Sequence, residues 1–278
     1  MQRQLSEFST FGIGGPIRHL VEADSVDLIK EAFSFAATAK LPLVVVGKGS
    51  NCLFPDQGFD GVVLVNRIDF CTFSDSFVEV GAGYSFSLLG AQAAKRGLSG
   101  LEFASGIPAS VGGAVFMNAG ANGQETATTL HSVRFIDSEG GDKTFLAKDL
   151  HFAYRLSPFQ SMAGCIVSAT FALTKDEAAR SRQLTLLTHR LKTQPGKAKS
   201  AGCVFRNPST GPSAGALIDR CQLKGERVGG AKVSEIHANF IVNDASATCA
   251  DVRALIAHVQ KTVQEQTGVW LEPEVRII

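Results

Sequence analysis

The sequence has no excess of charge of either sign and no apolar run long enough to cross a membrane. Its 27 Lys and Arg residues nearly balance its 26 Asp and Glu residues, and the net charge of +1 gives no general basis for binding nucleic acid. No stretch approaches the roughly 18 uninterrupted apolar residues of a transmembrane helix, and the polar start MQRQLSEFST lacks the apolar core of a signal peptide. We therefore expect a cytoplasmic protein with no nucleic-acid partner and no membrane insertion.

The cysteines and histidines lack the spacings of metal sites and disulfide frameworks. The six cysteines are scattered without a C-x-x-C pair, and the six histidines show no H-E-x-x-H or comparable spacing. This argues against a zinc ribbon, a disulfide framework and bound metal, and it suits a reducing compartment. What remains is an ordinary globular composition, 45% apolar and 19% charged, over 278 residues that suffice for more than one domain.

Apolar periodicity predicts strands and helices that alternate along much of the chain. The predicted helices are 24–40 (capped by Asp24 or Ser25), 85–97, one from about Asp176 with Leu184, Leu187 and Leu191 on one face, 213–225, and 248–268 with a stripe of Val252, Leu255, Ile256, Val259 and Val263. The predicted strands are 43–51 (buried, running into a glycine turn), 61–65, 77–83, a hairpin over 132–150 with Gly140-Gly141 in its turn, 165–173, 240–242 and 269–278. The polar segment 192–202 is the predicted linker.

Two segments are rich in glycine. In LVVVGKGSN (43–51) the lysine is not followed by Ser or Thr, which excludes a P-loop, and Cys52 occupies the third glycine position of a dinucleotide fingerprint. This segment is either a backbone nest for an anion or a tight turn without a ligand. The run GIPASVGGAVFMNAGANG (106–123) has five glycines, four alanines and no charge. A close internal crossing of the chain would have the same composition, but two such segments together favour a dinucleotide cofactor.

Six blocks, in order, resemble the UDP-N-acetylenolpyruvoylglucosamine reductases. The blocks are GKGSN (47–51), GLSGLEFASGIPASVGGAVFMNAGANG (97–123), YRLSPF (154–159), SAGCVFRNP (200–208), GGAKVSEIHANFIVN (229–243) and LEPEVRII (271–278), and the match spans the chain from TFGIGGP (10–16) onward. The short interval from Tyr154 to Cys203 is similar to the subtype that lacks an extra tyrosine-bearing substrate loop. Two positions depart from the family pattern: Ala109 stands where glycine is common, and Asn122 where tyrosine is common.

The resemblance implies an α+β, three-domain flavoprotein of the vanillyl-alcohol oxidase/PCMH-type FAD-binding fold with a C-terminal α/β substrate domain. Residues 1–66 and 67–195 would be FAD-binding subdomains, and 196–278 would bind the substrate. The implied reaction is the NADPH-dependent reduction of UDP-N-acetylglucosamine enolpyruvate to UDP-N-acetylmuramate through FAD, in peptidoglycan synthesis. The implied FAD-binding residues are Gly47, Lys48, Gly49, Ser50, Asn51, Gly106, Ser110, Gly112, Gly113, Asn118 and Gly120.

Three further residues match the catalytic set of the resembled family. A lone cysteine such as Cys203 is usually a small buried apolar residue, but the family generally has a proton-donating serine here. A thiol with an ordinary pKa of about 8.5 is mostly protonated at neutral pH and can serve as that acid. Pattern alone leaves Arg155 as a surface side chain or a buried cation, and the resemblance assigns it to the substrate carboxylate and the enolate. Only the resemblance selects Glu274 over Glu272, to assist enolate formation or position the acid.

Arg206, Asn207 and His237 are expected to contact the diphosphate or sugar of the substrate. Two other functions stay open at this stage. One is an oxidase or electron-transfer flavoprotein of the same fold, which oxygen or a redox partner would reoxidise faster than the enolpyruvyl substrate. The other is a nucleotide-sugar binding module without flavin, which would be colourless when purified.

Overall fold

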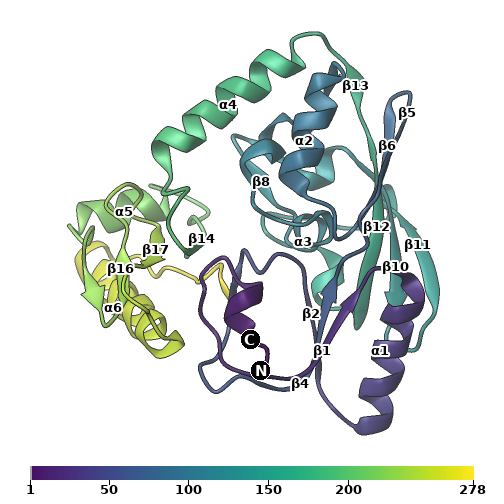
Figure 1. Cartoon of the computed structure of the whole chain (residues 1–278). Coiled ribbons are helices and arrows are strands. Elements are labelled where there is room, and N and C mark those ends of the chain that lie inside the picture. Colours follow the sequence, from purple (N-terminus) through teal and green to yellow (C-terminus); the bar gives the residue numbers. More distant parts are fainter. Residues whose placement is uncertain (1) are drawn as a thin grey trace. The chain divides into compact units, whose positions relative to one another are not determined.

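The computed structural model describes residues 2–278, which divide into two compact units (Figure 1). The first unit combines the described residues up to Arg18 with Gly49–Phe59 and Leu191–Ile278, and the second combines His19–Lys48 with Asp60–Arg190. Segments of the two units therefore alternate along the chain. The predicted domains 1–66, 67–195 and 196–278 are continuous in sequence, whereas each compact unit combines separate segments. The division into three domains therefore stays a prediction.

Two sheets frame the second unit. A five-stranded antiparallel sheet has the order β11-β10-β12-β6-β5, and a three-stranded sheet has the order β1-β4-β2 with β2 and β4 parallel. The strands are β1 Ile17–Ala23, β2 Leu43–Val46, β4 Phe59–Asn66, β5 Cys71–Ser74, β6 Phe77–Gly81, β10 Leu130–Asp137, β11 Asp142–Leu146 and β12 Gly164–Ala172. The strands predicted at 61–65, 77–83 and 165–173 and the hairpin over 132–150 are confirmed.

Helices bury both faces of the five-stranded sheet. Val133 and Phe135 of β10 belong to the core that also holds residues of α2 (Phe86–Lys95) and α3 (Val111–Phe116). The next residue, Ile136, belongs to the core built with α1 (Val26–Ala39), as expected for side chains that alternate across a strand. Figure 1 shows α1 on one face of this sheet and α2 and α3 on the other. The helices predicted at 24–40 and 85–97 are confirmed, with Ser25 and Ser85 as their caps.

Some predicted surfaces are more exposed than the sequence indicated. The strand β2 was predicted as buried, but Val45 is 37% exposed, because β2 lies at one edge of its sheet. The helix α4 (Ala179–Thr193) leaves Leu184 and Leu191 exposed. Shorter elements complete the described chain: β7 Leu98–Ser99, β13 Thr174–Lys175, β8 Gly120–Ala121, β9 Gln124–Glu125 and the 3-10 turns Leu5–Phe8, Glu102–Gly106, Thr126–Thr128, Ala147–Asp149 and Pro158–Gln160.

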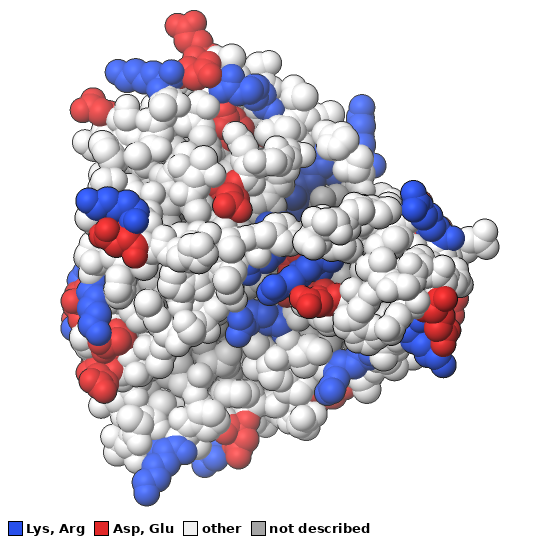
Figure 2. All heavy atoms as spheres, turned by 180° about the vertical axis from the view of Figure 1, so that it is seen from behind, with Lys and Arg blue, Asp and Glu red and all other residues white. Residues whose placement is uncertain are grey.

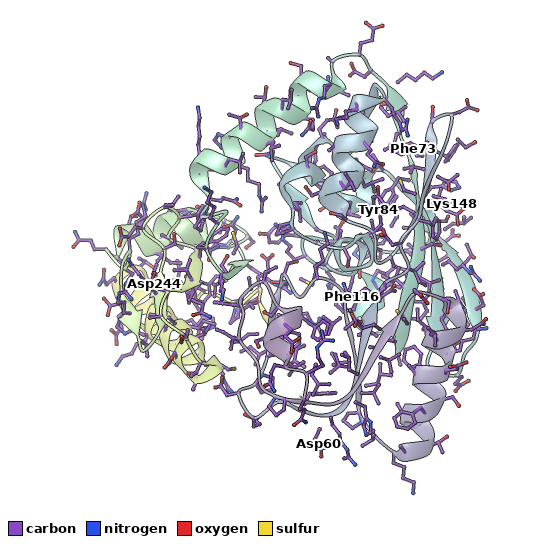
Figure 3. All side chains as sticks on the ribbon, viewed as in Figure 1. Asp60, Phe73, Tyr84, Phe116, Lys148 and Asp244 are labelled. Carbon is purple, nitrogen blue, oxygen red and sulfur yellow. The ribbon has the colours of Figure 1, made fainter. Side chains whose placement is uncertain are left out.

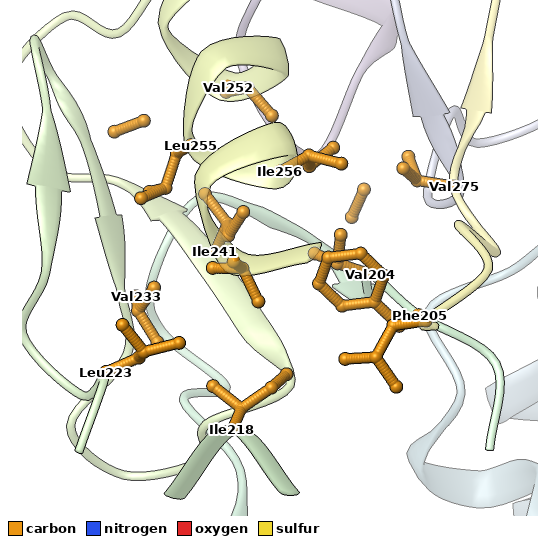
Figure 4. Packing of buried hydrophobic residues seen from close by; sticks show 14 of the residues in the cluster. Val204, Phe205, Ile218, Leu223, Val233, Ile241, Val252, Leu255, Ile256 and Val275 are labelled. Carbon is orange, nitrogen blue, oxygen red and sulfur yellow. The ribbon is translucent and has the colours of Figure 1, made fainter. Parts of the chain in front are cut away.

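The first unit places a four-stranded antiparallel sheet of order β14-β17-β16-β15 against two helices. Its elements are β14 Ser200–Cys203, α5 Ala214–Arg220, β15 Arg227–Val228, β16 Ala231–Val233, β17 Phe240–Asn243 and α6 Cys249–Thr267. The predicted stripe of α6 is buried in the core of this unit, where Val252, Leu255 and Ile256 lie among residues of the sheet (Figure 4). The predicted strand 240–242 and helices 213–225 and 248–268 are confirmed, although α5 ends at Arg220.

The C-terminal segment is not the single long strand predicted over 269–278. Within it, β18 (Arg276–Ile277) pairs in parallel with β3 (Cys52–Leu53), and Pro273 forms an isolated antiparallel bridge with Phe205. The N–H groups of Glu274 and Val275 both donate to the Val204 carbonyl, at 2.7 and 3.4 Å, so the regular alternation of a strand ends here. The segment is therefore tied to the strand that carries Cys203 in an irregular way.

Charges of both signs are interspersed over the face drawn in Figure 2, so neither sign dominates it. Among residues 2–278, no helix combines the length and the apolar character that crossing a bilayer requires.

Candidate active site

The turn after β2 meets the small-residue run 106–123 inside the second unit. A Cβ on Gly47 would lie 2.2 Å from Ser110 Oγ, so this approach requires glycine. Lys48 Nζ donates a hydrogen bond to Ser85 Oγ at 2.8 Å, and Ser85 and Ser110 form an antiparallel bridge. The structure thus brings together Gly47, Lys48 and Ser110, which the sequence predicted to share a cofactor site.

The electrostatics around Lys48 suit an anion. Partial desolvation lowers the pKa of its ammonium group, and the nearby charge of Asp69 opposes this shift. A cation whose charge is disfavoured by desolvation is stabilised by an anion placed beside it. A cation, two serine hydroxyls and a backbone without a side chain at Gly47 together fit the pyrophosphate of the expected flavin coenzyme.

Part of the glycine content of the run 106–123 follows from close packing within the protein. A Cβ on Gly112 would lie 2.9 Å from Ala82 Cβ, and one on Gly120 would lie 2.5 Å from the Gln124 carbonyl oxygen. A Cβ on Gly106 would meet Arg190 Cδ at 2.2 Å. Contacts of Gly106, Gly112, Gly113 and Gly120 with a cofactor stay predictions, and internal packing already restricts three of these positions.

The departure at Asn122 has a local explanation. Asn122 and Gly123 connect β8 to β9 and have φ angles of +54° and +77°. A two-residue hairpin with both central φ angles positive is a type I′ turn, for which Asn-Gly is the favoured pair. Asparagine therefore suits the backbone here better than the tyrosine common in the resembled family.

The remaining residues of the GKGSN segment belong to the first unit. Gly49 has φ +59°, and a Cβ there would lie 1.9 Å from the Phe8 carbonyl oxygen. Asn51 Nδ2 donates to the Glu274 carbonyl at 3.2 Å, and the Arg276 N–H donates to the Asn51 carbonyl at 3.0 Å. Asn51 thus connects the predicted coenzyme turn to the segment that carries Glu274. Its contact with FAD, and that of Ser50, stay predictions.

Cys203 and Glu274 lie on neighbouring segments of the first unit. Cys203 ends β14, opposite Phe240 of β17. The next residue, Val204, accepts the Glu274 N–H at 2.7 Å, and Phe205 and Pro273 form an antiparallel bridge. Glu274 is half-buried, whereas Glu272 is exposed. The fold therefore brings two residues of the predicted catalytic set together and distinguishes Glu274 from Glu272, which the sequence pattern did not.

Asn239 holds the Cys203 strand from its other side and was not predicted. Its side chain is buried, and it accepts from the Phe205 N–H at 2.9 Å while donating to the Phe205 carbonyl at 2.8 Å. The Asn239 N–H donates to His237 Nδ1 at 3.2 Å, which leaves Nε2 as the protonated nitrogen of a neutral His237 ring. The one sequence signal for Asn239 was its position between the predicted substrate contact His237 and the predicted strand 240–242.

The three predicted substrate contacts, Arg206, Asn207 and His237, lie within two residues of Phe205 or Asn239 in the sequence. Arg206 Nε is buried without a hydrogen-bond partner, although the Arg206 N–H donates to the Glu272 carbonyl at 2.9 Å. Asn207 is exposed, and its Oδ1 accepts from the N–H of Ala214 at the start of α5. An unpaired buried donor on a guanidinium group is a reason to expect a ligand there.

Arg155 occupies a strained turn in the second unit. Its φ of +57° lies in the left-handed region, which costs a non-glycine residue about 1–3 kcal/mol. The turn is closed by hydrogen bonds in both directions between Ala153 and Leu156. Arg155 Nη2 donates to the Gly120 carbonyl at 3.0 Å, and its guanidinium lies 4.9 Å from the centre of the Tyr154 ring. Arg155 is half-buried. Its bond to Gly120 directs the guanidinium toward the small-residue run 106–123.

Asn118, a predicted cofactor ligand, is fully buried and has φ +41°. Its Nδ2 donates to the Ala153 carbonyl at 2.9 Å, and its Oδ1 accepts from the Ala127 N–H at 3.0 Å. Both ends of the amide are thus engaged within the protein, and a contact with the cofactor stays a prediction.

Among residues 2–278, no cluster of three or more His, Cys, Asp or Glu side chains could hold a metal ion.

Two protein families match parts of the chain. An FAD binding domain family matches residues 17–142, and the C-terminal domain of UDP-N-acetylenolpyruvoylglucosamine reductase matches residues 194–278.

Proteins named UDP-N-acetylenolpyruvoylglucosamine reductase resemble the whole chain. Those of Protochlamydia amoebophila and Chlamydia muridarum are 54% and 52% identical over 99% of this chain and 92% of their own length. The crystal structure of UDP-N-acetylenolpyruvylglucosamine reductase from Thermus caldophilus is 38% identical and superimposes with a TM-score of 0.85, covering 100% of this chain and 98% of that one. The chain therefore belongs to the UDP-N-acetylenolpyruvoylglucosamine reductase family.

Proposed function

We propose that Cys203, Arg155 and Glu274 carry out the reaction of this family in the present chain. Family membership confirms the predicted flavoprotein fold and cofactor. The chain is an FAD-dependent oxidoreductase that reduces UDP-N-acetylglucosamine enolpyruvate to UDP-N-acetylmuramate in peptidoglycan synthesis, with NADPH as the reductant. The roles of individual residues are the proposal.

The coenzyme supplies, when bound, the hydride that originates from NADPH. Lys48 would pair with the coenzyme pyrophosphate, because its partly desolvated ammonium group gains from a neighbouring anion. The Ser110 hydroxyl fills the space that a side chain at Gly47 would need, so this hydroxyl and the main-chain N–H groups of the turn would lie together beside the phosphate oxygens.

The observation that carries the catalytic assignment is the pairing of the Cys203 strand with the Glu274 segment. Hydride addition at the methylene carbon of the enolpyruvyl group leaves negative charge that spreads into the carboxylate. The carbon next to that carboxylate must then receive a proton, which the Cys203 thiol can donate. The half-buried Glu274, whose N–H bonds to the residue after Cys203, would orient this acid or support the enolate.

Arg155 would hold the substrate carboxylate. A guanidinium group presents two parallel donors to a carboxylate and stabilises the negative charge that develops during hydride addition. Arg206, with its buried and unpaired Nε, would bind the diphosphate, and Asn207 and His237 would contact diphosphate or sugar oxygens.

We infer that the enzyme acts in the cytoplasm. The six scattered cysteines support this, since residues 2–278 contain them all and pair none of them in a disulfide.

Two substitutions of Cys203 test the proposal. Because serine also carries a transferable proton, Cys203→Ser should keep appreciable turnover, whereas Cys203→Ala should lose roughly 10²- to 10⁴-fold in substrate reduction. Reduction of the flavin by NADPH should survive in both variants. Stopped-flow absorbance of the flavin resolves the two half-reactions, and Cys71→Ala, at another half-buried cysteine, is the matched control.

Normal substrate reduction in Cys203→Ala would remove the thiol from the mechanism. Reoxidation of the reduced enzyme by oxygen far faster than by the enolpyruvyl substrate would instead indicate an oxidase.

A further inference from the structure

Three polar side chains hold the turn that carries Arg155: Asn118, Ser157 and Gln160. We propose that these are positioning residues, which fix the Arg155 guanidinium for the substrate carboxylate. This inference rests on the role proposed above for Arg155. None of the three is proposed to touch the reacting atoms.

Asn118 supports the residue at which the turn begins, Ala153. Its Nδ2 bonds the Ala153 carbonyl, and the Ala153 N–H bonds the Leu156 carbonyl across the turn at 3.1 Å. Asn118 is 0% exposed, so water cannot replace this bond if the amide is removed. The buried amide therefore determines where the turn begins.

Ser157 and Gln160 connect the other side of the turn to the end of α3. Ser157 Oγ and Gln160 Nε2 both donate to the Phe116 carbonyl, at 2.7 and 2.9 Å. Phe116, which is labelled in Figure 3, is the last residue of α3 and lies within the small-residue run. Gln160 Nε2 also donates to the carbonyl of Arg155 itself, at 3.0 Å. A single amide nitrogen therefore joins the run to Arg155.

The strained backbone gives these bonds a specific task. A non-glycine residue keeps a left-handed φ only where its surroundings determine the conformation more than once. Here the bonds from Asn118 and Gln160 flank Arg155 on both sides, while its guanidinium donates to the Gly120 carbonyl. Loss of a flanking bond should let the backbone relax and carry the guanidinium away from its position.

Gln160→Glu is the sharpest test. The glutamate has the same shape, but its carboxylate cannot donate and would face two carbonyl oxygens. Because small displacements of a positioned group can cost about 10²-fold, we expect substrate reduction to fall by about 10- to 100-fold. Flavin reduction by NADPH and flavin affinity should stay unchanged. Gln160→Lys keeps a donor and should recover most of the rate, and Gln266→Glu on the exposed face of α6 is the matched control.

A double-mutant cycle separates positioning from general stability. In an Arg155→Ala background there is no guanidinium to position, so adding Gln160→Glu should lower substrate reduction no further. An equal loss in both backgrounds would overturn the proposal in favour of a merely structural role. If Gln160→Glu reduces the substrate at a normal rate while Arg155→Ala is impaired, the positioning role is wrong and the role of Arg155 stands. A normal rate for Arg155→Ala would overturn the role of Arg155 itself.

Should Gln160→Glu fail to fold or to retain flavin, Ser157→Ala replaces it. That variant removes one of the two donors to the Phe116 carbonyl without introducing a charge. The proposal expects the same selective loss in the substrate half-reaction, and wild-type kinetics in both half-reactions would refute it.

Discussion

Removal of the Asn239 side chain should destabilise the first unit and loosen the strand of Cys203. In Asn239→Ala, the N–H and carbonyl of Phe205 both lose their partners, which now bond at 2.9 and 2.8 Å. Phe205 is 2% exposed, so water cannot easily replace the amide. Each of these two buried unpaired groups costs about 1–3 kcal/mol, so the free energy of unfolding should fall by about 2–6 kcal/mol.

The position of the one tryptophan makes this measurable. Trp270 belongs to the same unit as Asn239, so its fluorescence during a urea titration reports the unfolding of that unit. Asn239→Asp keeps an acceptor for the Phe205 N–H but places a carboxylate against the Phe205 carbonyl. It should be destabilised at neutral pH and should regain stability as the pH falls, because a protonated carboxyl group can donate. Gln266→Ala, on the exposed face of α6, is the control.

A loss below about 0.5 kcal/mol in Asn239→Ala would contradict the reasoning, because it would resemble an ordinary surface substitution.

Three further outcomes follow from the structure. Lys48→Met should weaken FAD binding about 10- to 100-fold, the usual value of a hydrogen bond to a charged group, and fluorescence titration of the apoprotein would show it; unchanged affinity would exclude Lys48 from the coenzyme site. Leu255→Ala should lower the free energy of unfolding by about 2–5 kcal/mol, since Leu255 is 0% exposed, and a smaller effect in urea titrations would mean that the core around α6 collapses to fill the space. Burial raises the pKa of Glu102, but hydrogen bonds from Gly100 and Arg182 outweigh it and lower the pKa overall. Its contribution to stability is therefore present above the ordinary carboxyl pKa and lost as the pH falls through the lowered value, so Glu102→Gln should flatten the acid side of the stability profile, and an unchanged profile would refute this.

Local signals predicted most of the helices correctly. The hydroxyls of Ser25, Ser85, Ser213 and Thr248 each accept a backbone N–H in the first turn of a helix, at positions that the sequence marks with Ser or Thr. The apolar stripe of α6 was predictable for the same reason, because its spacing depends only on helix geometry. These features are properties of short windows of sequence.

The supporting residues of the candidate site could not be predicted in this way. Asn239 bonds Phe205, 34 positions away, and Asn118 bonds Ala153, 35 positions away. The residues next to either asparagine in the sequence do not indicate that its side chain bonds Phe205 or Ala153. The same holds for the C-terminal segment, where alternation predicted a strand but the Val204 carbonyl accepts from both Glu274 and Val275 and makes the connection irregular. Long-range hydrogen bonding decided each case.

The discontinuous make-up of the first unit has a consequence for how the chain is made. Phe11, Ile13 and Leu53 are buried in the same core as Leu255 and Ile256, and Asn243 Nδ2 bonds the Phe11 carbonyl across 232 positions. During synthesis from the N-terminus, these early residues must wait for the last helix to emerge from the ribosome, whereas the second unit has all its segments once Arg190 is made. A fragment starting at Leu191 would lack those three side chains, so it is a poor choice for expression on its own.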